Sequence, residues 1–172
     1  MNQFALWLAA TPPSVFIQEH NAWAIPAIQT VHIVGIALVM GSVLMIDLRI
    51  LGLAWTEHTL RQTTGRFGPW LTGSLWLLLV TGLLMVVGEP VRELVSFSFW
   101  LKMALVALGA AVAVSFQRAL RRQEQSWERK AAQPSIKLLA VLTFFVWIGI
   151  IFLGRLIAYD HVWGSWSPSV RQ

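Results

Sequence analysis

The stretch VHIVGIALVMGSVLMIDLRILG, residues 31 to 52, is apolar enough to lie in lipid, yet it has a histidine near its start and an aspartate and an arginine near its end. An ionisable group inside a membrane costs a few kcal/mol on insertion scales. Such groups therefore usually face the interior of a helix bundle, where they mark a pathway, a partner or a cofactor. His32 is for this reason the first candidate functional residue.

The composition of the whole chain indicates an integral membrane protein. Of 172 residues, 56% are hydrophobic and 12% are charged, and the mean hydropathy is +0.64. Four segments reach the length of about 20 apolar residues that a bilayer requires, near residues 24–46, 70–87, 97–120 and 136–159. The start MNQFALWLAATPPS predicts a short interfacial helix, because two prolines interrupt it before it could span. We therefore expect an all-α fold, a single membrane domain of residues 1–172 forming an antiparallel four-helix bundle.

The distribution of basic residues predicts the orientation of the bundle. Most of them flank the first and third connections between the apolar segments, and few lie near the two chain ends. By the positive-inside rule, both termini then lie on the outer, periplasmic side of a bacterial inner membrane. Basic residues in these connections set the orientation of the bundle in the membrane and do not form a nucleic-acid-binding surface, so no nucleic-acid partner is expected. The charged segment 118–135 is expected to continue the third helix as far as Pro134.

Three basic side chains on different segments are predicted to share one layer of the bundle. A helix rises about 1.5 Å per residue, which places His32, Lys102 and Arg155 at similar depths below the outer surface. Two alternatives remain open. Lys102 and Arg155 have stems long enough to snorkel to the interface, and His32 could simply hydrogen-bond to a neighbouring helix.

The residues around His32 suit a flat cofactor. Gln29, His32 and Gly35 follow a spacing of three, which keeps them along one stripe of a helix. Gly35 would leave room for a macrocycle to approach the backbone, or else it allows close packing of helices. The chain contains no cysteine, so any metal must be held by other side chains. Imidazole is a good ligand for haem iron, and buried basic side chains would neutralise the propionates.

A second group of polar residues is predicted at the outer rim. His20 follows Glu19 before the first apolar segment, and His161 follows Asp160 after the last. These two imidazoles and two carboxylates could hold copper or zinc, or they could be solvated. At the opposite end, Asp47 and Arg49 are expected to satisfy one another or the adjoining loop, and His58 is expected in a loop. Phosphate-binding, nucleophile-elbow and zinc-protease motifs are absent.

Three motifs carry a resemblance to known families. The segments HIVGIALVMGSVLMIDLRILG, SFWLKMALVALG and GRLIAY make the chain similar to a family of uncharacterised bacterial four-helix membrane proteins. A histidine in the first helix and Trp-Leu-Lys at the start of the third also resemble the HemJ-type protoporphyrinogen oxidases. That resemblance implies haem b and points to His32 and Lys102. The segment RKAAQPSIK lacks the Asn-Glu-x-Pro signature of HemJ-type proteins, so it implies the haem pocket rather than the reaction. The copper-resistance D type of membrane protein has a comparable histidine and glycines.

The sequence thus predicts a b-type haem protein that passes electrons between an outer-side partner and membrane quinone, alone or as the anchor subunit of a larger oxidoreductase. His32 would be the axial ligand, Lys102 a second ligand or a propionate partner, Arg155 a propionate partner and Gln29 a hydrogen-bond partner. The alternatives are a copper-handling protein using His20, His32 and His161, and a structural subunit. Expected partners are membrane lipid, quinone, and a protein subunit or a second copy of the chain.

Overall fold

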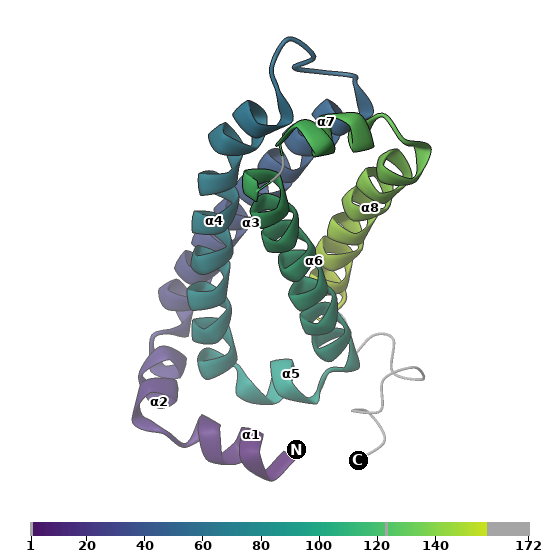
Figure 1. The fold of residues 1–172 in the computed structure, drawn as a ribbon. Coiled ribbons are helices and arrows are strands. Elements are labelled where there is room, and N and C mark those ends of the chain that lie inside the picture. The colour runs from purple at the N-terminus through teal and green to yellow at the C-terminus, as the bar shows by residue number, and fades with distance from the viewer. Residues whose placement is uncertain (1, 123, 158–172) are drawn as a thin grey trace.

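The computed structural model describes residues 2–122 and 124–157, and this part of the chain forms helices without strands. Four helices are long and apolar enough to cross a membrane. They are α3 (Asn21–Leu51), α4 (Leu60–Gly88), α6 (Phe97–Arg122) and α8 (Pro134–Ile157). The short helices are α1 (Asn2–Ala9), α2 (Pro12–Glu19), α5 (Pro90–Val95) and α7 (Glu124–Ala131). The predicted all-α fold with four long apolar helices is confirmed (Figure 1).

The first three long helices cover the predicted segments 24–46, 70–87 and 97–120, although α4 begins ten residues before the expected start at residue 70. α8 covers the described part of the fourth segment, 136–159, whose last two residues lie outside the described residues. Its N-terminus is fixed by a capping box, in which Thr59 Oγ1 accepts from the Gln62 amide at 3.2 Å and Gln62 Oε1 accepts from the Thr59 amide at 2.9 Å. Pro69 lies inside the helix and does not end it. The preceding helix, α3, ends at Leu51 and is capped by Gly52, whose φ of 76° is the left-handed conformation favoured by glycine.

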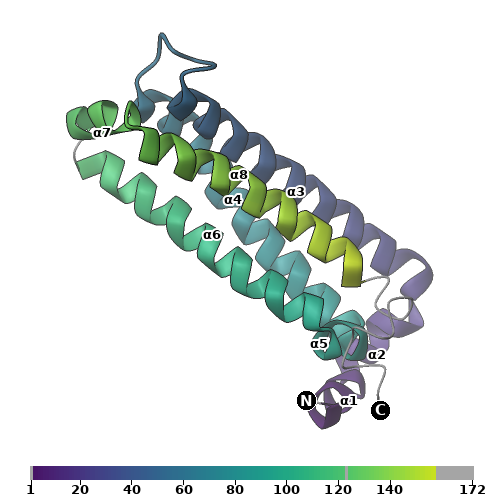
Figure 2. The same cartoon turned by 90° about the vertical axis from the view of Figure 1, so that its right-hand side faces the viewer.

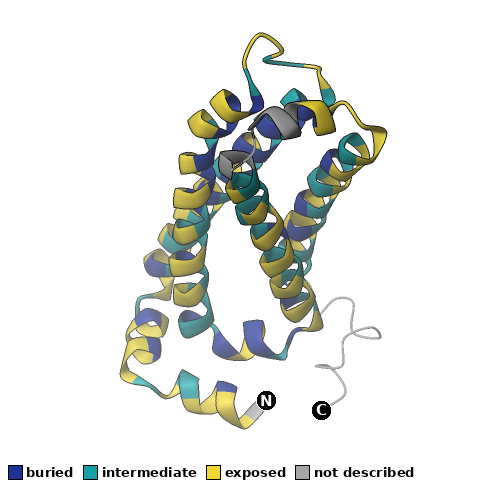
Figure 3. Ribbon diagram, viewed as in Figure 1, coloured by how far each residue is buried: buried dark blue, intermediate teal, exposed yellow. Residues whose placement is uncertain are grey.

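The four long helices pack as two pairs. α3 lies along α4 and α6 lies along α8, while α8 also contacts α3 and joins the pairs into one bundle (Figures 1 and 2). The larger core, which includes Val39, Leu71 and Trp147, forms where these helices meet. Buried residues follow the inner faces of the ribbon, and exposed residues follow the outer faces (Figure 3). Large apolar side chains such as Trp76 and Phe152 are exposed there, as expected of a surface facing lipid.

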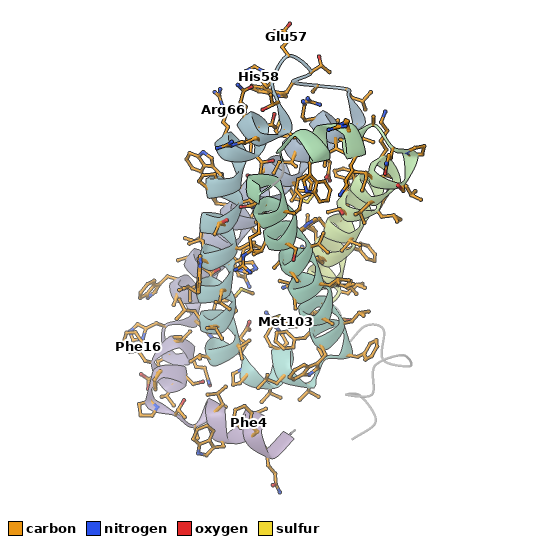
Figure 4. All side chains as sticks on the ribbon, in the orientation of Figure 1. Phe4, Phe16, Glu57, His58, Arg66 and Met103 are labelled. Atoms are coloured by element: carbon orange, nitrogen blue, oxygen red, sulfur yellow. The ribbon has the colours of Figure 1, made fainter. Side chains whose placement is uncertain are left out.

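The two ends of the bundle differ in the short elements that cover them. At one end, here called the α5 end, α1 packs against α5 and α2 packs against α4. The N-terminal segment is two helices rather than the one predicted, because the chain breaks around Thr11 before Pro12 starts α2. Phe4 and Phe16 lie at this end, whereas Glu57, His58 and Arg66 lie at the opposite end (Figure 4). That opposite end is called the α7 end.

The charged segment after α6 does not continue as one helix to Pro134, so that prediction was wrong. α6 ends at Arg122, and the separate helix α7 lies across the end of the bundle, where it contacts α4 and α8 (Figure 1). The apolar Trp127 in this segment packs edge-on against Phe116, with ring centroids 5.3 Å apart. Burying that indole against α6 requires the chain to turn back over the bundle.

Candidate functional site

His32 lies in the half of α3 nearer the α5 end, and its ring faces α4. Its Nδ1 atom is 2.7 Å from the hydroxyl oxygen of Thr81. A Cβ atom added to the next residue, Gly82, would lie 3.7 Å from His32 Cε1. Thr81 is buried and its hydroxyl donates to the Leu77 carbonyl of its own helix at 2.7 Å. A chain of two hydrogen bonds therefore joins the imidazole to the backbone of α4.

This chain of hydrogen bonds determines which nitrogen of His32 carries the proton. A threonine hydroxyl has one proton to donate. Because Thr81 directs it to Leu77, the hydroxyl oxygen accepts from His32 Nδ1–H. In a neutral imidazole the other nitrogen, Nε2, then has the free lone pair that ligates metals. The predicted alternative, a hydrogen bond from His32 to a neighbouring helix, is confirmed, and it leaves the ligating nitrogen unused.

Lys102 reaches the same end of the bundle from α6. The first turn of that helix is capped by Ser96, whose Oγ accepts from the Phe99 amide at 3.3 Å. The Lys102 Nζ atom lies 3.5 Å from the position that a Cβ atom on Gly154 would occupy, so its ammonium rests against α8. Its charge acts on His32 and on Glu93. Lys102 thus turns across the bundle toward other helices.

Glu93 is the member of this group that the sequence did not reveal. It is only 4% exposed, lies on α5, and is 3.5 Å from the Arg92 guanidinium. Burial raises the pKa of its carboxyl above the ordinary value, while the charges of Lys102 and Arg92 oppose that shift. The missed signal was Pro90, which is typical of the first position of a helix and places Glu93 on a helical turn.

Together, His32, Thr81, Glu93 and Lys102 form what we call the polar cluster. Its members come from α3, α4, α5 and α6, and Lys102 is the residue whose charge links His32 to Glu93. An imidazole with a fixed tautomer, an ammonium and a carboxyl can bind an ion or a charged cofactor, or exchange protons. Arrangements of this kind within apolar helices are expected to have a function rather than to add stability.

The other predicted cofactor residues have different surroundings. A Cβ atom on Gly35 would lie 2.9 Å from Leu78 Cδ2, so this glycine serves close packing of α3 on α4, the second of the two roles left open. Gln29 is half-buried one turn before His32. Arg155 follows Gly154, which places it at the level of Lys102, but its side chain is exposed. Burial therefore distinguishes Lys102 from Arg155, although their depths are similar.

The predicted copper ligands do not form a group in the described part of the chain. His20 lies at the junction of α2 and α3, where its Nδ1 is 2.9 Å from the Phe16 carbonyl oxygen. Twelve residues of almost continuous helix separate it from His32, a rise of about 18 Å, so the two imidazoles cannot ligate one ion. His161 lies outside the described residues. Within those residues, no three His, Asp or Glu side chains are placed to hold a metal.

The fold and the polar cluster define an all-α protein with four helices able to cross a membrane and ionisable side chains gathered near one end. The chain belongs to a family of unknown function, DUF6644, whose family model matches residues 21–160. That match spans all four long helices, and it provides no link to the HemJ-type or copper-resistance D type proteins. No curated protein and no solved structure matches the chain.

Proposed function

We propose that this protein is a b-type haem-binding membrane protein that passes electrons between an outer-side partner and membrane quinone. The observation that carries the proposal is the hydrogen-bond chain from His32 through Thr81 to the Leu77 carbonyl. Histidines that ligate metals usually donate from the other ring nitrogen, which fixes the tautomer and the ring orientation. His32 meets this condition, with Nε2 as the nitrogen left for iron.

The residues around His32 fit one axial imidazole ligand. On the α4 side, Gly82 presents no side chain to the ring, and a Cβ atom there would lie 3.7 Å from His32 Cε1. On the Gly35 side, Leu78 fills the space. Bundle interiors are common places for haem. A bound haem would supply a centre that accepts and returns one electron at a time.

The position of Lys102 favours one of the two roles proposed for it. An axial lysine ligand must be a neutral amine, whereas a propionate partner is an ammonium ion. The Lys102 nitrogen rests against α8, 3.5 Å from the position of a Cβ atom on Gly154, whereas the His32 ring faces Thr81 of α4. Lys102 is therefore the propionate partner in this proposal, and His32 is the iron ligand. Arg155 would provide a second positive charge near the boundary with water.

The proposed location is a bacterial inner membrane, with the α5 end and both termini on the periplasmic side. This orientation follows from the basic residues at the α7 end, among them Arg49, Arg61 and Arg66, and from the positive-inside rule. It would place the polar cluster within reach of an outer-side electron partner. The protein would act alone, as a homo-oligomer or as the membrane anchor of a larger oxidoreductase.

The test is a visible spectrum of protein purified from membranes, before and after reduction. We expect a Soret band that shifts on reduction and is lost in His32→Ala. His20→Ala is the matched control, because it removes an imidazole outside the polar cluster and should leave the spectrum unchanged. Thr81→Val keeps the shape of the side chain but removes the hydroxyl, and should lower haem affinity by about 10- to 100-fold.

Other outcomes would assign the protein differently. Full haem occupancy with an unchanged spectrum in His32→Ala would show that another residue ligates the iron. Bound copper without a Soret band would indicate the copper-handling alternative, whose ligands would then differ from the predicted set. If protein purified from cells supplied with haem were colourless and contained no metal, the structural-subunit alternative would be favoured.

A further inference from the structure

A cavity of about 440 Å³ lies near the α7 end of the bundle, away from the polar cluster. Its walls come from α3, α4, α6, α7 and α8, and most of them are apolar, including Ile46, Leu71 and Phe116. Trp127 of α7 also lines it, so the turned-back helix covers part of its end. The volume is within the range of small-molecule sites, which measure about 300 to 1,000 Å³.

Three residues that line this cavity each carry a buried polar atom that lacks a hydrogen-bond partner among the described residues. These atoms are the Asp47 carboxyl oxygen Oδ2, the Gln117 amide nitrogen Nε2 and the Trp147 indole nitrogen Nε1. Asp47 is 7% exposed and Trp147 is 3% exposed. Buried polar groups in native proteins are nearly always paired, and those left unpaired call for an explanation such as a ligand. Three such atoms on residues that line one cavity point to a ligand that pairs with them after a small turn of the side chains.

Some of the residues that line the cavity are also exposed on the outside of the bundle. Val112 of α6 is 36% exposed and Leu139 of α8 is 48% exposed, and both line it. These two helices are in close contact at the middle of their lengths, where a Cβ atom on Gly109 would lie 3.2 Å from the Trp147 ring. Toward the α7 end they diverge (Figure 1). A ligand would therefore enter between α6 and α8, from the apolar surroundings.

We infer that this cavity binds the ring of a lipid-soluble quinone or quinol, with its tail leaving between α6 and α8. Gln117 and Trp147 can only donate through the unpaired nitrogens, and a quinone offers ring oxygens that accept. Asp47 can accept a hydrogen bond from the hydroxyl of a quinol. The apolar walls suit the ring and the tail. This inference rests on the proposed function, because it locates the quinone with which the haem would exchange electrons.

A lipophilic cation is the other ligand class that an aspartate in an apolar cavity could attract. Such a cation would pair with Asp47 but would offer nothing to the two N–H donors. Gln117 and Trp147 would then remain unpaired in its presence. The combination of two donors with one carboxyl favours the quinone, and the two classes are separated by experiment.

The test is titration of the purified full chain in detergent micelles with a decyl-substituted benzoquinone, followed by calorimetry. We expect saturable binding of one quinone per chain. Trp147→Phe and Gln117→Leu each remove one donor and should weaken binding about tenfold, the effect of losing one hydrogen bond. Thr143→Val is the matched control: this side chain also lines the cavity, but its hydroxyl already donates to the Leu139 carbonyl at 2.9 Å. Its affinity should match that of the wild type.

Several outcomes would overturn the inference. One is the absence of saturable binding, and another is equal affinity in the wild type and both donor variants. A third is competition by the cation tetraphenylphosphonium. If this cation displaced the quinone from the wild type but not from Asp47→Asn, the cavity would be a cation site. His32→Ala separates this inference from the proposed function, because the quinone titration does not need haem. Quinone binding without a Soret band would support the cavity alone, and a Soret band without quinone binding would support the haem site alone.

Discussion

The contact between Gly35 and Leu78 provides a quantitative test of how α3 and α4 hold the polar cluster. A methyl group added in Gly35→Ala would lie 2.9 Å from Leu78 Cδ2 and 3.3 Å from its Cγ. Carbon atoms prefer a separation of about 3.5 to 4.0 Å, so α4 or the Leu78 side chain must move by about 0.6 to 1.1 Å. Such overpacking typically costs about 1 to 3 kcal/mol. Because Leu78 Cδ2 is the end of a flexible side chain, we expect a loss at the lower end of this range in the free energy of unfolding, relative to a Gly-to-Ala change in the same helix that meets no contact.

Gly41→Ala is the matched control for this prediction. It adds the same methyl group to the same helix, but nothing lies within 4 Å of the new atom. The intrinsic preference of a helix for alanine over glycine is then common to both variants, and their difference isolates the contact with Leu78. The measurement is denaturant unfolding in detergent micelles. Equal stability of the two variants would refute the packing argument.

The same substitution also has a consequence for His32. Leu78 lies one turn before Thr81 on α4, and Gly35 lies one turn after His32 on α3. If α4 itself moves by about 0.6 to 1.1 Å, the 2.7 Å hydrogen bond from His32 to Thr81 lengthens to about 3.3 to 3.8 Å, beyond the usual limit. In that case Gly35→Ala weakens haem binding as Thr81→Val does. If only the Leu78 side chain moves, haem binding stays unchanged while stability still falls.

Three further predictions concern other parts of the molecule. Because burial raises the pKa of Glu93 above 4.5, the unfolded chain loses this proton at lower pH than the folded chain, and Glu93 opposes folding increasingly as pH rises. Glu93→Gln should therefore melt at a higher temperature than the wild type at pH 7.5, and the difference should vanish near pH 4. A lower melting temperature of the variant at pH 7.5 would mean that the attraction of Glu93 to Arg92 and Lys102 outweighs the cost of its burial. Thr59→Ala removes the capping box of α4 and should cost about 1 kcal/mol in the free energy of unfolding, whereas the exposed Thr56→Ala should cost much less. For orientation, a membrane-impermeant thiol reagent applied to intact spheroplasts should label Gln3→Cys but not Glu57→Cys, since the chain has no other cysteine; the reverse pattern would invert the proposed topology.

The fold could be predicted because lipid limits what an apolar segment can do. A run of about 20 apolar residues must satisfy its own backbone, which leaves a helix as the solution. The limits of α4 were less predictable, because residues 60 to 69 combine polar side chains with two glycines and a proline that suggest a loop. The capping box at Thr59 was present in the sequence as Thr59 and Gln62, and it outweighed those breakers. The break before α7 depends on the long-range contact of Trp127 with Phe116, which no local pattern contains.

The sequence predicted how deep in the bundle the candidate side chains lie, but not whether each of them faces the bundle interior. Counting residues along a helix gives a height, and the heights of Lys102 and Arg155 agree with the contact between Lys102 and Gly154. The rotation of each helix about its axis decides whether a side chain faces the bundle or its surroundings. That rotation is set by packing, and it turns Lys102 inward while Arg155 is exposed. A residue on an interfacial turn, such as Glu93, has no apolar periodicity around it at all.

The distance between the two polar regions sets the length of the proposed electron path. His32 lies toward the α5 end, and the unpaired atoms of Asp47, Gln117 and Trp147 lie toward the α7 end. Between His32 and Asp47, α3 rises about 22 Å, because fifteen residues separate them. A haem and a quinone ring have their own extent, so the gap between their edges would be shorter than this rise. The bundle would then carry electrons across part of the membrane. At quinol concentrations below saturation, haem reduction that is about tenfold slower in Gln117→Leu, while the Soret band persists, would demonstrate that coupling. Reduction at the wild-type rate would show that the cavity lies off the electron path.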